Sequence, residues 1–378
     1  MEIAIIGAGI AGLLSAYNLL RKGVNVTIFE KRRYFPRKHC TGVVSKNTLN
    51  NMPYANRFVT GKYNTVALYL DLGNKLLQIR IYFNEFAAYK IERVYHELLL
   101  LERLKELGAS IQSLHNVLEI NECCEKVKLS VFQHNSNKVL KLFFDRAVVA
   151  EGYPSNLSLK IGCKSTSLPL NALQREFIIK GSYDKNSLYV YINPKYFGFG
   201  FAWLVPYGDE NAVIGYASEK ITPKYLFSHV INKFSRIMDI KIERTLSNFY
   251  GGNVLIGYPI KFTSSKRKCI CIGDAVAMVK SISGGGLYAI THFANSLYNI
   301  MIEYGKTNEK SLHKLSNELM KQYYLKRIIW QAISSSVLKK ILSCVTLEKN
   351  IIEIRARDIE QFDKHEKILL SKPKFAKV

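Results

Sequence analysis

The pattern of apolar and polar residues at the start of the chain predicts a strand, a tight turn, a helix and a second strand. Residues 2–6 form a β-branched apolar run, and apolar residues recur at helical spacing between Leu13 and Leu20. A second β-branched run over residues 24–29 ends in Glu30. Two such runs around one helix are typical of a βαβ unit with parallel strands.

Three glycines, Gly7, Gly9 and Gly12, separate the first run from the helix. In a dinucleotide-binding turn the first glycine permits the tight turn, the second lets the backbone approach a pyrophosphate, and the third lets the helix pack closely on the sheet. Glu30 ends the second strand, where a carboxylate accepts hydrogen bonds from a ribose. An acid at this position favours the adenosine of FAD or NAD over that of NADP. A purely structural glycine turn is the alternative, which the flanking strands and helix disfavour.

Beyond residue 60, the periodicity of apolar residues predicts a further helix and a second sheet. Residues 91–107 have helical spacing and end at Gly108, as a helix with a C-terminal glycine does. Residues 157–257 contain many short alternating segments, and residues 63–83 form a hairpin pattern of the same kind. Residues 311–367 are amphipathic with basic flanks and are expected to be helical.

Composition and charge narrow the class of protein. The chain of 378 residues is 48% hydrophobic and 22% charged, as in a folded globular protein. Its net charge of +24 favours an anionic partner, either an acidic protein or a lipid surface, because no nucleic-acid-binding module is present. A lysine-rich solvated surface explains the charge equally well. No apolar run reaches the ~18 residues of a membrane span.

The seven cysteines are scattered and lack the spacing of a zinc site or a disulfide framework. This distribution predicts a reducing, cytoplasmic setting without a metal. The glycine turn begins so close to residue 1 that we expect no signal peptide.

Four more stretches combine glycine with reactive or aromatic residues. They are residues 39–45, 91–93 and 201–208, and the pair 273–275 and 284–288. Together with the glycine turn, their order and spacing resemble the geranylgeranyl reductase family, within the para-hydroxybenzoate-hydroxylase class of flavoproteins. The resemblance extends from Met1 to about Tyr298 and is weakest between Asn47 and Lys90.

The resemblance implies a mixed α/β fold of the α+β kind. A Rossmann-like FAD-binding domain of the glutathione-reductase type is expected beside an antiparallel-sheet substrate domain and C-terminal helices. The expected divisions are 1–62, 84–156 and 258–305 for FAD binding, 63–83 and 157–257 for the substrate, and 306–378 for the helical region.

The resemblance also implies roles for single residues. Asp274 would bind the ribityl chain of FAD, Arg93 the pyrophosphate or ribityl region, and Val117 the adenine through its backbone. The triple glycine before Leu287 would present N–H groups and a positive helix end to the flavin pyrimidine. The full expected set is Gly7, Gly9, Ala11, Gly12, Glu30, Lys31, Cys40, Thr41, Gly42, Val44, Arg93, Val117, Gly273, Asp274, Gly285, Gly286 and Leu287.

Cys40 is the candidate catalytic residue, because a thiol in the loop that crosses the flavin can assist proton delivery. An ordinary loop thiol is the alternative. Phe201, Trp203 and Pro206 are expected to contact substrate, together with an aromatic channel that includes Tyr196, Phe197 and Phe199, although such residues also pack sheet cores.

Three positions depart from the family pattern and leave the substrate open. Ser281 replaces a common proline, Phe201 replaces a common tyrosine, and Glu151 replaces a common aspartate.

The resemblance implies an FAD-dependent reductase that saturates isoprenoid double bonds of geranylgeranyl lipids. Only one dinucleotide turn is present, so electrons would come from transiently bound NAD(P)H or from an external carrier such as an acidic ferredoxin. The alternatives are a flavin monooxygenase or halogenase of the same fold, and a flavin-binding redox protein without turnover. The sequence does not indicate an oligomeric state.

The C-terminal helices would either lie on the inner membrane surface or cap the core. The apolar residues concerned are Ile328, Ile329, Trp330, Ile333, Val337 and Ile341, flanked by Lys326, Arg327, Lys339 and Lys340.

Overall fold

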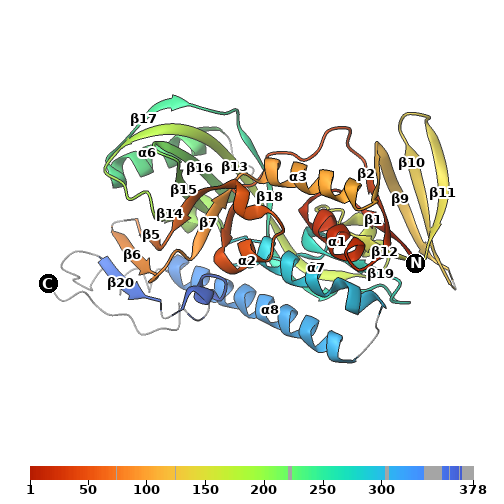
Figure 1. Cartoon of the computed structure of the whole chain (residues 1–378). Coiled ribbons are helices and arrows are strands. Elements are labelled where there is room, and N and C mark those ends of the chain that lie inside the picture. Colours follow the sequence, from red (N-terminus) through yellow and green to blue (C-terminus); the bar gives the residue numbers. More distant parts are fainter. Residues whose placement is uncertain are drawn as a thin grey trace.

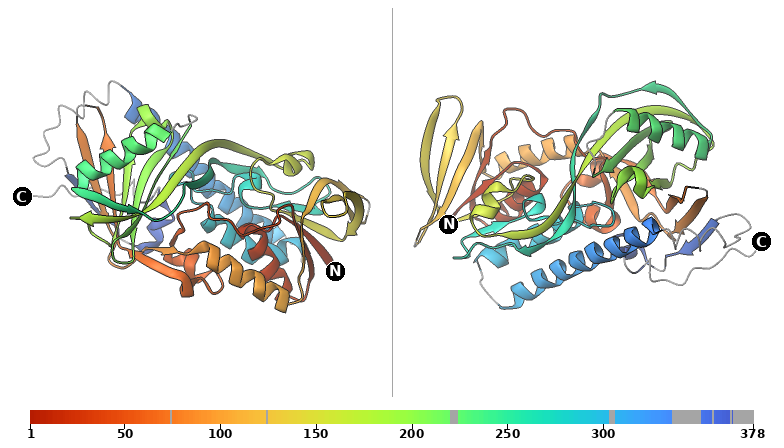
Figure 2. Two further views of the ribbon diagram at one scale, coloured as in Figure 1. Left: turned by 90° about the horizontal axis from the view of Figure 1, so that it is seen from above. Right: turned by 180° about the vertical axis from the view of Figure 1, so that it is seen from behind.

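The computed structural model describes residues 1–73, 75–123, 125–219, 224–302, 306–335, 351–356, 358–365 and 367 (Figure 1). One part is built around a parallel sheet near the N-terminus and another around a larger sheet, and helix α8 (Lys306–Ser334) runs along both (Figures 1 and 2). None of the described helices has the length and apolar character needed to cross a membrane.

The first sheet has five parallel strands in the order β19-β12-β1-β2-β8. Its central strand is apolar on both faces, with Ile3, Ala4 and Ile5 fully buried, as a parallel strand covered on both sides requires. The strands are β1 (Glu2–Ile6), β2 (Asn25–Glu30), β8 (Ser110–Ser113), β12 (Arg146–Val149) and β19 (Cys269–Cys271). The predicted βαβ unit is therefore confirmed.

Helices and a meander cover this sheet. Helix α1 (Ile10–Leu20) packs against α3 (Arg93–Glu106) and α7 (Leu287–Ile302). The meander packs on β2 through the edge-to-face contact of Phe144 with Phe29, whose ring centroids are 5.7 Å apart. Its strands are β9 (His115–Glu122), β10 (Val127–Gln133) and β11 (Lys138–Phe144).

The second sheet has nine strands in the order β17-β13-β16-β15-β14-β5-β6-β20, with β18 paired to β13. Most pairs are antiparallel as predicted, but β14–β5 and β20–β6 are parallel. The strands are β5 (Thr65–Asp71), β6 (Leu76–Tyr82), β13 (Lys164–Gly181), β14 (Ser187–Ile192), β15 (Phe201–Tyr207), β16 (Asn211–Ser218), β17 (Ile240–Thr245), β18 (Tyr250–Lys261) and β20 (Ile351–Arg355).

Strand β20 corrects the prediction for the C-terminal region. Residues 306–334 are helical as expected, but Ile351–Arg355 pairs in parallel with the edge strand β6. An apolar segment gains more from completing an exposed sheet edge than from an isolated helix, because the unpaired edge offers a row of backbone donors and acceptors.

The two faces of the second sheet have different partners. Tyr69, Tyr191 and Leu204 point toward helix α6 (Lys224–Met238) and form a core with its apolar face. The alternate residues point to the other face. Along it, hydrogen-bonded register places Ile79, Leu68, Val190 and Trp203 in one row across β6, β5, β14 and β15. This apolar row faces away from α6 because neighbouring residues of a strand point to opposite faces.

Shorter elements join the two parts. A small sheet of β3 (Val43–Ser45), β7 (Ala88–Ile91) and β4 (Val59–Tyr63) lies where they meet. The short helices are α2 (Lys46–Asn50), η1 (Ala55–Phe58), α4 (Asn156–Lys160), α5 (Pro194–Phe197), η2 (Gly273–Val276) and η3 (Ile359–Phe362).

Candidate functional site

A cavity of about 1480 Å³ extends from the glycine turn after β1 to the apolar face of the second sheet. This volume exceeds the ~300–1,000 Å³ of a pocket for one small molecule. The cavity is therefore large enough for a dinucleotide at one end and a second molecule at the other.

The glycine turn forms one end of the cavity. Gly7 has a φ of +104°, and a side chain on it would strike the carbonyl of Ala150 at 2.4 Å. A side chain on Gly12 would strike the carbonyl of Gly7 at 2.0 Å, so Gly12 lets α1 pack on the turn. Gly9 has open space beside it and lines the cavity together with Ala11. Gly12 itself does not line it.

Glu30 holds the glycine turn in place. Its side chain is buried, and its carboxylate accepts hydrogen bonds from the backbone N–H groups of Ala8 and Arg32, each at 2.9 Å. Glu30, Lys31 and Val117 all line this end of the cavity.

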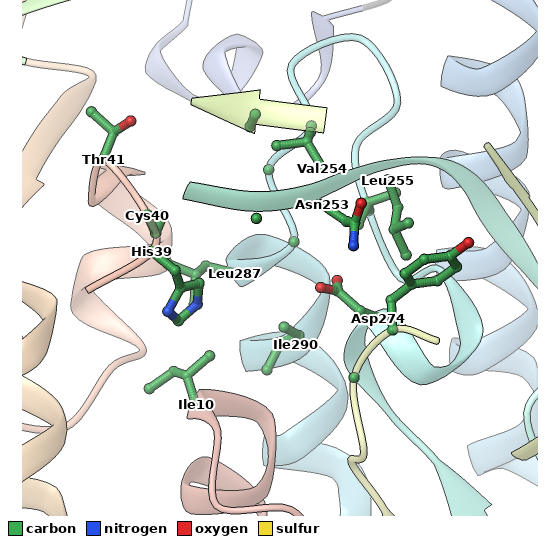
Figure 3. Close-up of a pocket in the computed structure, with 18 of the residues that line it drawn as sticks. Ile10, His39, Cys40, Thr41, Asn253, Val254, Leu255, Asp274, Leu287 and Ile290 are labelled. Atoms are coloured by element: carbon green, nitrogen blue, oxygen red, sulfur yellow. The ribbon is translucent and has the colours of Figure 1, made fainter. Parts of the chain in front are cut away.

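The loop after residue 38 forms a side wall of the cavity. Cys40, Thr41 and Val44 line it, whereas Gly42 does not. Gly42 has a φ of +86° and accepts a hydrogen bond from Ile91 N–H at 2.9 Å, so it fixes the loop to β7. Figure 3 shows His39, Cys40 and Thr41 on the side opposite Asp274 and Asn253.

Gln174 of β13 supports this loop, a role that no motif in the sequence predicts. Its amide oxygen accepts from the Thr41 hydroxyl at 2.6 Å, and its amide nitrogen donates to the His39 carbonyl at 3.1 Å. The second sheet thereby positions the loop that carries Cys40.

Arg93 lies at the start of α3 beside Cys40. Its guanidinium pairs with Glu97, and both side chains are buried and line the cavity. Burial acts to lower the pKa of Arg93, but the Glu97 carboxylate and the Cys40 thiol outweigh it and raise the pKa above its ordinary value. The Nε of Arg93 has no partner among the described residues. A buried cation with a free donor is suited to bind an anion.

Asp274 lies across the cavity, in η2. Gly273 beside it has a φ of +71° and faces Ala11 of α1, but does not itself line the cavity. Burial raises the pKa of Asp274 to about 6, against the opposing effect of the Arg93 guanidinium.

The triple glycine leads from this side of the cavity into α7. Gly284 has a φ of +72° and donates to the Lys280 carbonyl at 2.7 Å. Gly285, Gly286 and Leu287 line the cavity at the N-terminus of α7. The expected cofactor residues from both ends of the chain therefore meet around one space.

The far half of the cavity is apolar. Phe201 and Trp203 line it as predicted, but Pro206 does not, because β15 presents alternate residues to the cavity and Pro206 follows Val205, which lines it. Tyr196, Phe197 and Phe199 are also outside the lining, so the wall is mainly aliphatic rather than aromatic. The apolar lining residues are Val66, Leu68, Leu70, Ile79, Ile81, Leu188, Val190, Ile192, Phe201, Trp203, Val205, Ile329, Trp330, Ile333 and Phe362.

Helix α8 closes this half of the cavity. Ile329, Trp330 and Ile333 face inward, and Ile328 is 62% exposed on the outside. Lys326 is 1% exposed, so it is not one of the basic flanks of a membrane-facing surface. Val337, Lys339, Lys340 and Ile341 lie outside the described residues.

Comparison with known proteins decides the class of the site. Residues 2–88 match the family model of FAD dependent oxidoreductases, and these residues contain the glycine turn, Glu30 and the Cys40 loop. The protein is an FAD-dependent oxidoreductase. Its cofactor is therefore FAD, and the catalytic class follows from the same match.

Relatives confirm the resemblance to geranylgeranyl reductases. Digeranylgeranylglycerophospholipid reductase 1 of Methanococcoides burtonii is 23% identical over 301 residues, which cover 76% of this oxidoreductase and 70% of the relative. A geranylgeranyl bacteriochlorophyll reductase-like protein of Thermoplasma acidophilum has the same fold, with a TM-score of 0.72, 16% identity and coverage of 92% of this chain and 94% of that chain.

The fold is shared with flavin enzymes of other activities. The p-nitrophenol 4-monooxygenase of Pseudomonas putida matches with a TM-score of 0.66 at 15% identity, covering 98% of each chain. The predicted fold class is thus confirmed, whereas the fold alone does not select the reaction of this oxidoreductase.

The pKa of Asp274 makes the stability of the FAD-free oxidoreductase depend on pH. Its carboxyl has a pKa of about 6 in the folded protein, above the ordinary 3.8, so the folded state favours the protonated form. Stability should fall by about 2 kcal/mol as the pH rises from 4 to 6.5, and Asp274→Asn should remove most of this fall. Thermal melts of both proteins across this range test it. Parallel pH profiles would contradict it.

Proposed function

We propose that this oxidoreductase reduces carbon–carbon double bonds of isoprenoid chains on a polar lipid, with FAD as the hydride source. The supporting observation is the continuity of one cavity, whose glycine-turn end is lined by residues expected to bind FAD and whose other end is lined mainly by aliphatic side chains. The named activity of the relatives supports the same substrate class.

The residues around the first half of the cavity fit FAD. Gly7 and Gly12 leave room for a close backbone turn, and Gly9 leaves open space for a pyrophosphate beside the N-terminus of α1. Arg93 offers its unpartnered Nε to the pyrophosphate or ribityl region. Asp274 would accept from ribityl hydroxyls, and the triple glycine would present N–H groups to the flavin pyrimidine.

The second half of the cavity suits a long hydrocarbon chain. Leu68, Val190 and Trp203 lie side by side across three strands without a charged residue between them. Each buried CH₂ of a substrate contributes about 0.8 kcal/mol, and the same walls exclude water from the reacting carbons. This environment favours an alkene over a charged aromatic substrate.

Alkene reduction adds one hydride and one proton. Bound, reduced FAD supplies the hydride, and Cys40 is the candidate for the proton. The thiol lines the cavity, accepts a hydrogen bond from Gly42 N–H at 3.4 Å and lies beside the Arg93 guanidinium.

Replacing Cys40 with serine should lower the rate of alkene reduction by about 10²- to 10⁴-fold, because a hydroxyl is a far weaker acid than a thiol. Single-turnover rates under anaerobic conditions measure this, and the flavin absorbance should be unchanged. Cys123→Ser is the matched control, since Cys123 is exposed and lies on the β9–β10 turn. Equal rates in both variants would exclude Cys40 as the proton donor.

The surface suits the expected partners. The net charge of +24 attracts an acidic electron carrier or anionic lipid headgroups. The outer side of α8 exposes Ile328 and Tyr324 next to Arg327, with Ile260 of β18 also exposed, while the inner side lines the cavity. A bilayer contact there would bring lipid close to its site. Binding to anionic but not neutral vesicles is the expected result.

Mass spectrometry tests the function directly. Protein reduced chemically without oxygen is incubated with a geranylgeranyl lipid, and each saturated bond adds one pair of hydrogens to the substrate mass. Reoxidation of the flavin should accompany this gain. A flavin that stays reduced with no mass gain would contradict the proposal, and turnover that requires oxygen would indicate a monooxygenase instead.

A further inference from the structure

Lys326 is a buried lysine without a carboxylate partner. It lies on the inner side of α8 with 1% of its surface exposed, and no ion pair involves it among the described residues. Burying an unpaired ammonium is costly, so such a group needs a compensating interaction or a function.

Two kinds of contact hold the ammonium. It donates a hydrogen bond to the carbonyl of Ile282 at 3.2 Å. It also lies over the rings of Trp330 and Phe201, at 4.4 and 5.3 Å from their centroids. Both rings line the cavity, and Ile282 lies in the turn that leads into the triple glycine.

The surrounding charges leave this region positive. Lys280 of the same turn is paired with Asp363 at 2.7 Å, and His365 hydrogen-bonds to Ser283 at 3.0 Å. Glu219, the residue after β16, is the acidic group whose field reaches Lys326. Among the described residues, therefore, no carboxylate forms an ion pair with the ammonium of Lys326.

We propose that Lys326 is a positioning residue of the FAD site, which holds the Ile282 turn and places a positive charge behind the triple glycine, so that reduced FAD is favoured. A flavin ring that takes up two electrons and one proton becomes negative. A fixed cation in a low-dielectric surrounding stabilises that negative form relative to the neutral oxidised form. The inference uses the FAD site and does not depend on the lipid substrate.

The reduction potential of the bound FAD tests the proposal. Lys326→Met keeps the apolar stem and removes the charge. Its bound FAD should favour the reduced form about tenfold less than in the parent, which lowers the reduction potential by about 30 mV for two electrons. Lys326→Gln keeps a donor for Ile282 without charge and should show the same shift. Lys321→Met, on the exposed face of the same helix, should leave the potential unchanged.

The pH dependence separates an electrostatic role from a structural one. Burial lowers the pKa of Lys326 to about 7. The difference in potential between the parent and Lys326→Met should therefore be largest near pH 6 and disappear above pH 8.5. FAD affinity and melting temperature should change little, because methionine packs well in an apolar site.

Two results would overturn the proposal. The first is a reduction potential of bound FAD in Lys326→Met that equals the potential in the parent protein at pH 6. The second is a potential in Lys326→Gln that equals the potential in the parent protein. The hydrogen bond to Ile282, and not the charge, would then explain any shift in Lys326→Met. Because these readouts are independent of substrate, a failed lipid assay would leave them unaffected.

Discussion

Replacing Lys280 with methionine should lower the free energy of unfolding by about 3–5 kcal/mol. Lys280 and Asp363 form an ion pair at 2.7 Å, and their side chains are only 6% and 3% exposed. One carboxylate oxygen of Asp363 already has no partner among the described residues. Without Lys280 the whole carboxylate is buried and uncompensated. Denaturant unfolding, followed by the fluorescence of the two tryptophans, measures the loss.

The double variant Lys280→Met with Asp363→Leu is the control for this prediction. It removes both charges and should recover most of the stability of the parent, because an apolar pair of similar volume replaces the ion pair. If the double variant is as unstable as the single one, packing of the lysine stem and not the unpaired charge is responsible.

A carboxylate placed in the apolar half of the cavity should abolish lipid reduction. Val190→Asp introduces the charge in the row formed with Leu68 and Trp203. A substrate chain would have to desolvate this carboxylate at a cost of several kcal/mol, and each 1.36 kcal/mol is a factor of ten. We expect kcat/KM for the isoprenoid lipid to fall at least 100-fold, measured by mass gain.

Val190→Thr is the matched control, because threonine has the shape of valine and no charge. Its kcat/KM should fall by less than about tenfold. The visible spectrum of bound FAD should be the same in both variants, since Val190 lies in the half of the cavity away from the glycine turn. Equal losses in both would show that local packing, not the charge, limits the reaction.

The FAD half of the site could be predicted closely because its signals are local. Gly12 is required by its contact with Gly7 in the same short turn, and Glu30 follows at the end of the next strand. The helix α3 was also predicted, over residues 91–107, because helical spacing is a periodicity over neighbouring residues.

The substrate half could be predicted only in outline. Phe201 and Trp203 were expected, but the aliphatic row beside them depends on which strands pair and in which register. Alternation assigns Leu68 and Val190 each to one face of its own strand. It does not show that the two residues lie on the same face of the shared sheet. Pro206 was expected at the substrate because it belongs to the stretch 201–208 that resembles the reductase family.

The dinucleotide turn, the cysteine loop, the triple glycine and the order of strands and helices around them could all be recognised from the sequence alone. Three features emerged only from the folded chain: Gln174 supports the Cys40 loop, β20 joins the sheet edge, and Lys326 is buried against the turn that leads into the triple glycine. The two groups of features depend on interactions of different range along the chain. Backbone conformation and periodicity act between near neighbours, whereas burial, charge pairing and cavity walls depend on segments that the fold brings together from distant positions.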